Sequence, residues 1–278
     1  MAETATVLVT VKTYPSPSDR YGETVCVAGV RLDRGVPEWV RLYPMKFRLV
    51  DYEQQFKKYE IIEIPLTPRG SKDPRPESMR PDQTQMRSVR QVDTTKNWAE
   101  RRMLIQPLIG ATTTCDLIAA NRAVDYSQPA PSLGLVKVHD AELSVADGEP
   151  WEPNQLAKVI KAAQPDLFNP DGFRELQPAP FQVRVRYRCA DTGCPGHGPA
   201  LLDWETGQGG RRWSRESGPD RAKQMLQEKY EALFGVNIDT HLYVGNLHQH
   251  RTSFSALGIW TPKIEPPDPY EGHLLDYA

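Results

Sequence analysis

Two cysteines and a histidine lie close together in one short stretch of the sequence. Cys189, Cys194 and His197 fall within nine residues, and thiolate sulfur and imidazole nitrogen are donors that zinc accepts in proteins. A glycine-containing turn and the Pro195-Gly196 pair bend the chain there, so the three side chains can face one ion. The spacing, Cys-x4-Cys-x2-His, is wider than the common Cys-x2-Cys pair. We therefore predict a metal site with Zn2+ as the ion.

A closed tetrahedral zinc site needs a fourth protein ligand, which the local sequence does not supply. The candidates elsewhere are cysteines, histidines and carboxylates, namely Cys26, Cys115, His139, His241, His248, His250, Asp203 and Glu205. The patterns around Cys26, in a strand-like run, and Cys115, on the first turn of a helix, favour buried packing residues. The alternative is an iron–sulfur regulatory protein in which Cys26, Cys115, Cys189 and Cys194 ligate the cluster.

Arginines recur in patterns that suit contact with phosphate. The run from Phe181 to Cys189 alternates, which places Arg184, Arg186 and Arg188 on one face of a strand. Like charges in a row favour either an acidic strand or a phosphate backbone opposite them. Further candidates are Arg211, Arg212 and Trp213 in a glycine-rich loop, and Arg75 and Arg80 in an irregular insertion. Because a guanidinium group donates two hydrogen bonds to a phosphate and an indole ring stacks on bases, we predict DNA or RNA as the partner.

Two carboxylates offer an alternative chemistry. Asp203 and Glu205 flank Trp204 at the end of a predicted strand, 199–205, which would place both on one face. Such a pair can hold Mg2+ for phosphodiester hydrolysis. A nuclease of the restriction type would also have a lysine two residues later, where this chain has Gly207. Pairing with the arginines of the neighbouring strand is the competing use, so whether the protein is an enzyme stays open.

The elements that position these residues predict an α+β fold. Short strands at 6–13, 24–32, 38–43 and 59–66 indicate a small curled β-sheet or barrel in the N-terminal part. Strands at 181–189, 199–205, 240–245 and 253–260 predict a mixed C-terminal sheet, packed by one clear helix over 220–234 and carrying the metal-binding loop.

The domain organisation follows from where prolines and charges gather. We predict an N-terminal β-rich module over 1–146, with an arginine-rich insertion at 67–95 and short helices. A proline-rich linker spans 147–180, a metal-binding sheet-plus-helix module spans 181–261, and a flexible tail spans 262–278.

Composition limits the class of protein. The chain has 278 residues, 39% of them hydrophobic and 25% charged, with a net charge of −2, which is typical of a globular protein and excludes a polybasic tail. No apolar run approaches the roughly 18 to 20 residues of a membrane span. Four cysteines do not make a disulfide framework in a chain this long, so we expect a cytoplasmic protein. The sequence thus predicts a metal-stabilised nucleic-acid-binding protein outside the membrane.

Overall fold

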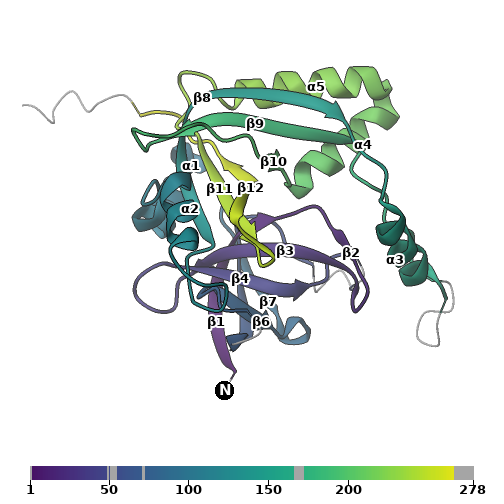
Figure 1. Ribbon diagram of the computed structural model, residues 1–278, viewed down its shortest axis with the longest axis horizontal. Helices are drawn as coiled ribbons and strands as arrows, with labels where there is room; N and C mark the ends of the chain where they lie inside the picture. Colours follow the sequence, from purple (N-terminus) through teal and green to yellow (C-terminus); the bar gives the residue numbers. More distant parts are fainter. Residues whose placement is uncertain (1, 49, 51–54, 71–72, 166–171, 266–278) are drawn as a thin grey trace, which may run out of the picture.

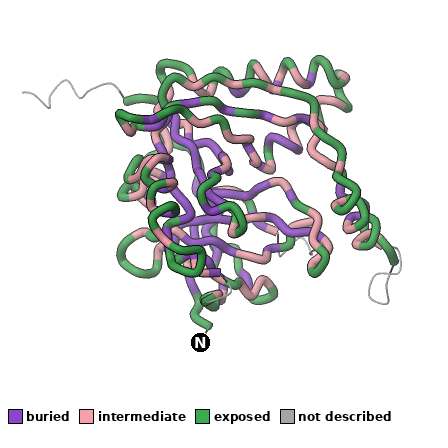
Figure 2. The backbone as a smooth tube through the Cα atoms, viewed as in Figure 1, coloured by how far each residue is buried: buried purple, intermediate pink, exposed green. Residues whose placement is uncertain are grey.

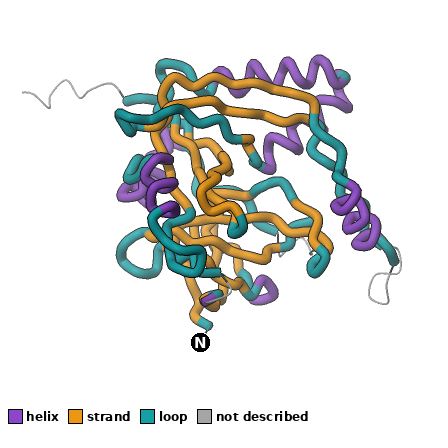
Figure 3. Tube along the Cα trace, in the orientation of Figure 1, coloured by secondary structure: helices purple, strands orange, loops and turns teal. Residues whose placement is uncertain are grey.

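A computed structural model describes residues 2–48, 50, 55–70, 73–165 and 172–265. These residues form two barrel-like sheets and several helices, so the predicted α+β class is confirmed (Figure 1). The strands of both sheets contribute most of the buried backbone, whereas helices and connecting loops lie toward the outside (Figures 2 and 3).

The first sheet is built from the N-terminal part of the chain. Its strands are β1 (Glu3–Lys12), β2 (Ser16–Ser18), β3 (Gly22–Arg31), β4 (Glu38–Met45), β5 (Glu60–Pro68), β6 (Ser78–Pro81) and β7 (Arg87–Gln91). Five of them run in the order β1-β3-β4-β6-β5, and pairing of β1 with β5 closes the ring. The predicted curled sheet is therefore a closed barrel, with β2 and β7 attached at its edges.

The second sheet is a closed barrel in the order β10-β12-β11-β8-β9. Its strands are β8 (Leu133–Asp147), β9 (Phe181–Cys189), β10 (Ala200–Leu201), β11 (His241–Leu247) and β12 (His250–Trp260). Since β8 pairs with both β9 and β11, this barrel takes in residues that the boundary at 146 assigns to the N-terminal module. The grouping of β8 with β9 and β11 depends on pairing between strands far apart in the sequence, which local composition does not indicate.

Five α-helices and two short 3-10 turns connect or cover the barrels in the described residues. They are η3 (Gln83–Gln85), α1 (Thr95–Ile105), η4 (Gln106–Leu108), α2 (Thr114–Arg122), α3 (Pro153–Ala163), α4 (Trp204–Ser217) and α5 (Pro219–Ala232). The last two lie along the β8–β9 pair (Figure 1). The predicted tail at 262–278 falls almost wholly outside the described residues. None of the described helices is long and apolar enough to cross a membrane.

Two predictions about local structure were wrong. The stretch 199–205 is a strand only at Ala200–Leu201, and the expected glycine-rich loop at 207–218 is mostly helix α4. Asp203 begins this helix, because its side chain accepts a hydrogen bond from the backbone N–H of Glu205. Two of its glycines allow close packing: a Cβ on Gly207 would lie 2.4 Å from the Tyr14 ring, and one on Gly210 would lie 2.9 Å from the Phe181 ring.

The two barrels share a core where β1 passes between them. Val7 and Val9 face the interior of the first barrel, whereas Leu8 and Val11 pack with residues of the second barrel such as Tyr243. Both faces of β1 are therefore buried from Val7 to Lys12, which agrees with the unbroken apolar run Val7–Val9. This apolar contact fixes the position of the two barrels relative to each other.

Candidate metal centre

Three cysteines and one histidine converge on a single point of the structure. Cys115, Cys189, Cys194 and His197 place their ligand atoms within 4.8 Å of one another. Cys115 Sγ lies 3.6 Å from Cys189 Sγ and 3.6 Å from His197 Nε2, and Cys194 Sγ lies 3.3 Å from the same nitrogen. A tetrahedral ion with bonds of about 2.3 Å to sulfur and about 2.0 Å to nitrogen separates its ligands by roughly 3.5 to 3.8 Å. This Cys3His group can therefore hold a metal ion.

A tight return of the chain after β9 positions three of the four ligands. Tyr187 and His197 form an antiparallel pair through both backbone hydrogen bonds, at 3.0 and 2.8 Å. Gly196 has φ of +93°, a conformation that a residue with Cβ rarely adopts. The loop is thereby closed at its base, and Cys189, Cys194 and His197 face one another across it.

The fourth member comes from helix α2, 74 residues before Cys189. A capping box fixes the start of this helix, since Thr113 accepts from the backbone N–H of Asp116 and Asp116 accepts from that of Thr113. Cys115 lies on the first turn, where the helix dipole favours a thiolate. The Thr114 hydroxyl bonds the Tyr187 hydroxyl at 2.7 Å, which fixes α2 against β9. Cys115 thus packs against the core of the second barrel, and it is also the fourth-ligand candidate that joins the group.

Backbone hydrogen bonds to sulfur favour the thiolate form that binds a metal ion. The backbone N–H groups of Cys189 and Gly196 donate to Cys194 Sγ at 3.3 and 3.4 Å. Burial disfavours the Cys189 thiolate, but hydrogen bonds with the backbone of Asp191 and Cys115 outweigh it and lower the Cys189 pKa to about 6. Burial and the neighbouring cysteines raise the pKa of Cys115 to about 12. An ion that binds here would displace the remaining thiol protons.

The other fourth-ligand candidates lie elsewhere. Cys26, on β3, accepts a hydrogen bond from Arg41 at 3.0 Å and does not belong to the group, so the described structure does not assemble the four-cysteine shell. His139 is exposed on β8, and His241 is buried with Nδ1 3.2 Å from the Asp239 carbonyl. His248 lies 3.6 Å from Asp73. His250 is exposed at the start of β12.

The arginines singled out in the sequence differ in exposure and in the partners they have within the protein. Arg184, Arg186 and Arg188 are all exposed on β9, in the predicted alternation. Arg75 is buried, ion-paired with Asp73 at 2.7 Å and bonded to the Asn246 carbonyl. Arg211 is bonded to the Tyr14 hydroxyl and to the carbonyls of Gln177 and Pro178. These two guanidinium groups are occupied within the protein.

The remaining residues of that set lie on other elements. Arg80 is exposed on β6, and Arg212 is exposed on α4 with Glu216 at 3.9 Å. Trp213 is half-buried against the core of the second barrel, with the Lys229 ammonium 5.6 Å from its ring. The structure thus brings only the β9 arginines into one row.

The two carboxylates meet a lysine that the sequence did not indicate. Lys58 Nζ lies 2.9 Å from Asp203 and 3.3 Å from Glu205, and the lysine side chain is only 8% exposed. Burial opposes its charge, but the two carboxylates raise the pKa of Lys58 above its usual range. The expected pairing with the β9 arginines is not formed. Asp203, which is buried and also begins α4, is occupied by Lys58 and the Glu205 backbone.

Comparison with known proteins divides the chain as the barrels do. No curated protein matches it. Residues 3–107, which hold the first barrel, match a family model described as a domain of unknown function (DUF8758). Residues 110–275, which hold the second barrel and all four members of the Cys3His group, match another, described as a domain of unknown function (DUF8757). Since this second match spans more than half of the chain, the protein belongs to the DUF8757 family.

Proposed function

We propose that the protein binds nucleic acid through the arginines of β9, and that a structural zinc ion in the Cys3His group holds this surface in place. The carrying observation is that Arg184, Arg186 and Arg188 form one exposed row that ends at the loop bearing His197. We call these three residues the arginine row.

Zinc is the ion that this donor set favours. Three thiolates and an imidazole form one of the common structural shells, whereas Mg2+ and Ca2+ prefer oxygen ligands. Four protein ligands leave no open position for a substrate, so the ion would act by joining α2 to the loop after β9. The described cysteines are all free thiols, which supports a reducing compartment, and we place the protein in the cytoplasm.

The arginine row is exposed, and within it Arg184 donates to the Gln182 amide oxygen at 3.1 Å and to the Gly198 carbonyl at 3.2 Å. Residues two apart on a strand are separated by about 6.6 Å, so the row presents three cations in line. Asp140 and Glu142 line the same groove as Arg186, Arg188 and His197. Among the described residues, however, no carboxylate lies within 4 Å of an arginine-row nitrogen. A phosphate backbone would supply the missing acceptors.

Fluorescence anisotropy with labelled single-stranded DNA, duplex DNA and RNA tests this proposal. We expect binding that weakens steeply with salt, and a variant with all three arginine-row residues changed to glutamine that binds weakly. If the partner is a single strand, the slope of log K against log salt should fall by about 2, since each phosphate contact contributes roughly 0.7.

The control removes the same charge from another surface. Arg34, Arg87 and Arg90 are exposed on the first barrel, and their triple glutamine variant should keep most of the affinity. If both triple variants lost affinity equally, the loss would come from the change in net charge and not from the position of the arginine row. Binding that does not respond to salt, or no binding by the zinc-loaded protein, would overturn the proposal.

A further inference from the structure

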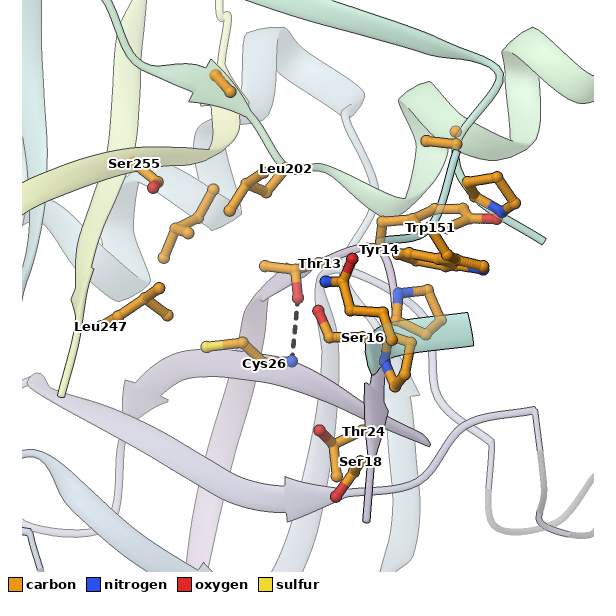
Figure 4. A pocket seen from close by; sticks show the side chains of 18 of the residues that line it. Thr13, Tyr14, Ser16, Ser18, Thr24, Cys26, Trp151, Leu202, Leu247 and Ser255 are labelled. Atoms are coloured by element: carbon orange, nitrogen blue, oxygen red, sulfur yellow. Dashed lines mark hydrogen bonds between the residues drawn. The ribbon is translucent and has the colours of Figure 1, made fainter. Parts of the chain in front are cut away.

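A large cavity lies between the two barrels and takes no part in the metal centre. It has a volume of about 850 Å³ and is lined from both sheets. Figure 4 shows Cys26, Leu202, Leu247 and Ser255 around one end, and Tyr14, Ser16 and Trp151 around the other. This volume lies within the range of pockets that bind organic ligands, roughly 300 to 1,000 Å³.

Two aromatic rings on the wall are held in fixed positions. Trp151 Nε1 donates to the Leu176 carbonyl at 2.8 Å, and the Tyr14 hydroxyl donates to the Gln177 carbonyl at 2.9 Å. Tyr14 also stacks on Trp204, with ring centroids 5.9 Å apart. Rings fixed by their polar ends lose little freedom when a flat ligand packs on them, which favours an aromatic heterocycle.

The polar groups of the wall are available to a ligand. The hydroxyls of Ser16, Thr24 and Ser255 have no hydrogen-bond partner among the described residues. Arg41 also lines the cavity, is buried, and donates to Cys26 Sγ and to the Ser132 carbonyl, both at 3.0 Å. No described carboxylate lies within 4 Å of its guanidinium. The lining also includes carboxylates, among them Asp19, Glu149 and Glu152. Hydroxyls, cations and carboxylates together match the donors and acceptors on the edge of a base.

The cavity adjoins one end of the arginine row. Gln182 and Ala200 both line it. Gln182 Oε1 accepts from Arg184 Nε at 3.1 Å, and Ala200 pairs with Arg184 across β9 and β10. A strand whose phosphates follow the row from Arg188 to Arg184 would therefore arrive at the cavity.

We propose that this cavity receives one unstacked base of the nucleic-acid strand whose phosphates lie on the arginine row. This inference rests on the function proposed above. Stacking of one base on an aromatic side chain contributes about 1 to 3 kcal/mol, which corresponds to roughly 5- to 150-fold in affinity. The base would pack near Tyr14 and Trp151, with its polar edge toward the hydroxyls and Arg41.

The test compares two single strands of about a dozen nucleotides, within the site size of single-strand binders. One has ordinary bases and the other is abasic throughout. We expect the zinc-loaded protein to bind the base-containing strand at least 5-fold more tightly. The variants Ser255→Trp and Ser16→Trp would each obstruct part of the cavity, and we expect each to bind both strands with the weaker affinity, at an unchanged salt slope.

Ser253→Trp is the matched control, because Ser253 is exposed on the same strand as Ser255 and does not line the cavity. It should keep the preference for bases. Equal binding of both strands by the unaltered protein, or a preference that survives both filling variants, would overturn the inference while leaving the phosphate contacts standing. Failure to bind either strand would overturn this inference, and the binding of duplex DNA and RNA described above would then decide the proposed function separately. Zinc content and circular dichroism show whether each variant is folded.

Discussion

At the residue scale, Cys115 decides whether the metal centre is complete. Replacement by serine removes one of four ligands, and we expect the purified Cys115→Ser protein to contain much less zinc. Its free energy of unfolding should fall by roughly 3 kcal/mol or more, because metal binding contributes directly to folding at a structural site. Elemental analysis and denaturant titration measure the two effects.

Cys26→Ser is the control for this prediction. Cys26 accepts from Arg41 but is not part of the Cys3His group, and a serine hydroxyl can still accept that hydrogen bond. This variant should retain its zinc. Loss of zinc from Cys26→Ser, or full zinc in Cys115→Ser, would contradict the ligand set.

Asp73 makes stability depend on pH in the acid range. Burial disfavours its charge, but hydrogen bonds and the charge of Arg75, with the Ser78 hydroxyl, outweigh burial and lower the pKa of Asp73 to about 2. Because the pKa is lower in the folded state, the charged carboxylate stabilises the fold at pH values above the pKa of the unfolded state, near 4. This stabilisation is lost as the pH falls toward 2. It amounts to roughly 2 kcal/mol.

The measurement is the difference in unfolding free energy between the natural protein and Asp73→Asn across pH. Taking the difference cancels any loss of metal that both proteins share. The advantage of the natural protein should be constant above pH 5 and shrink between about pH 4 and 2. A pH-independent difference would show that the pKa of Asp73 is the same in the folded and unfolded states.

At the element scale, two glycines of helix α4 differ in the space around them. A Cβ on Gly207 would lie 2.4 Å from the Tyr14 ring, whereas one on Gly209 would meet nothing within 4 Å. We expect Gly209→Ala to stabilise the protein by up to about 1 kcal/mol through helix propensity. Gly207→Ala should destabilise it by about 1 to 3 kcal/mol through overpacking. Thermal unfolding of both variants gives the comparison, and equal effects would contradict the packing role.

Sequence patterns correctly predicted elements such as β9, in which the periodicity of the element's own residues indicates the structure. The alternation of β9 indicated which side chains are buried, and Val183, Val185 and Tyr187 do lie inside. The same reasoning failed for α4, because glycines that allow close packing look like a loop. It named Cys115 among several candidates for the fourth ligand but could not select it, since the folding of α2 onto β9 joins residues far apart in the sequence. The capping box before Cys115 was the local signal that fixed its position on the first turn of α2.

At the scale of the whole molecule, a buried ion pair adds to the apolar contact between the two barrels. Lys58 belongs to the segment before β5, and Asp203 begins α4 beside the second barrel. Lys58→Met should cost about 3 to 5 kcal/mol, because it leaves the buried Asp203 charge without a partner. Glu205→Gln should cost less than about 1 kcal/mol, since that side chain is 57% exposed.

A double-mutant cycle with Asp203→Asn separates this pair from other effects. If the cost of Lys58→Met comes from the stranded charge, it should be much smaller in the Asp203→Asn background. Additive effects in the cycle would show that the two side chains do not stabilise each other.

The account as a whole depends on one ion held between α2 and the loop after β9. X-ray absorption at the zinc edge of the purified protein measures its shell directly. We predict one zinc ion per chain with three sulfur ligands at about 2.3 Å and one nitrogen ligand at about 2.0 Å. Iron in place of zinc, a shell of oxygen and nitrogen alone, or a protein without bound metal would contradict it.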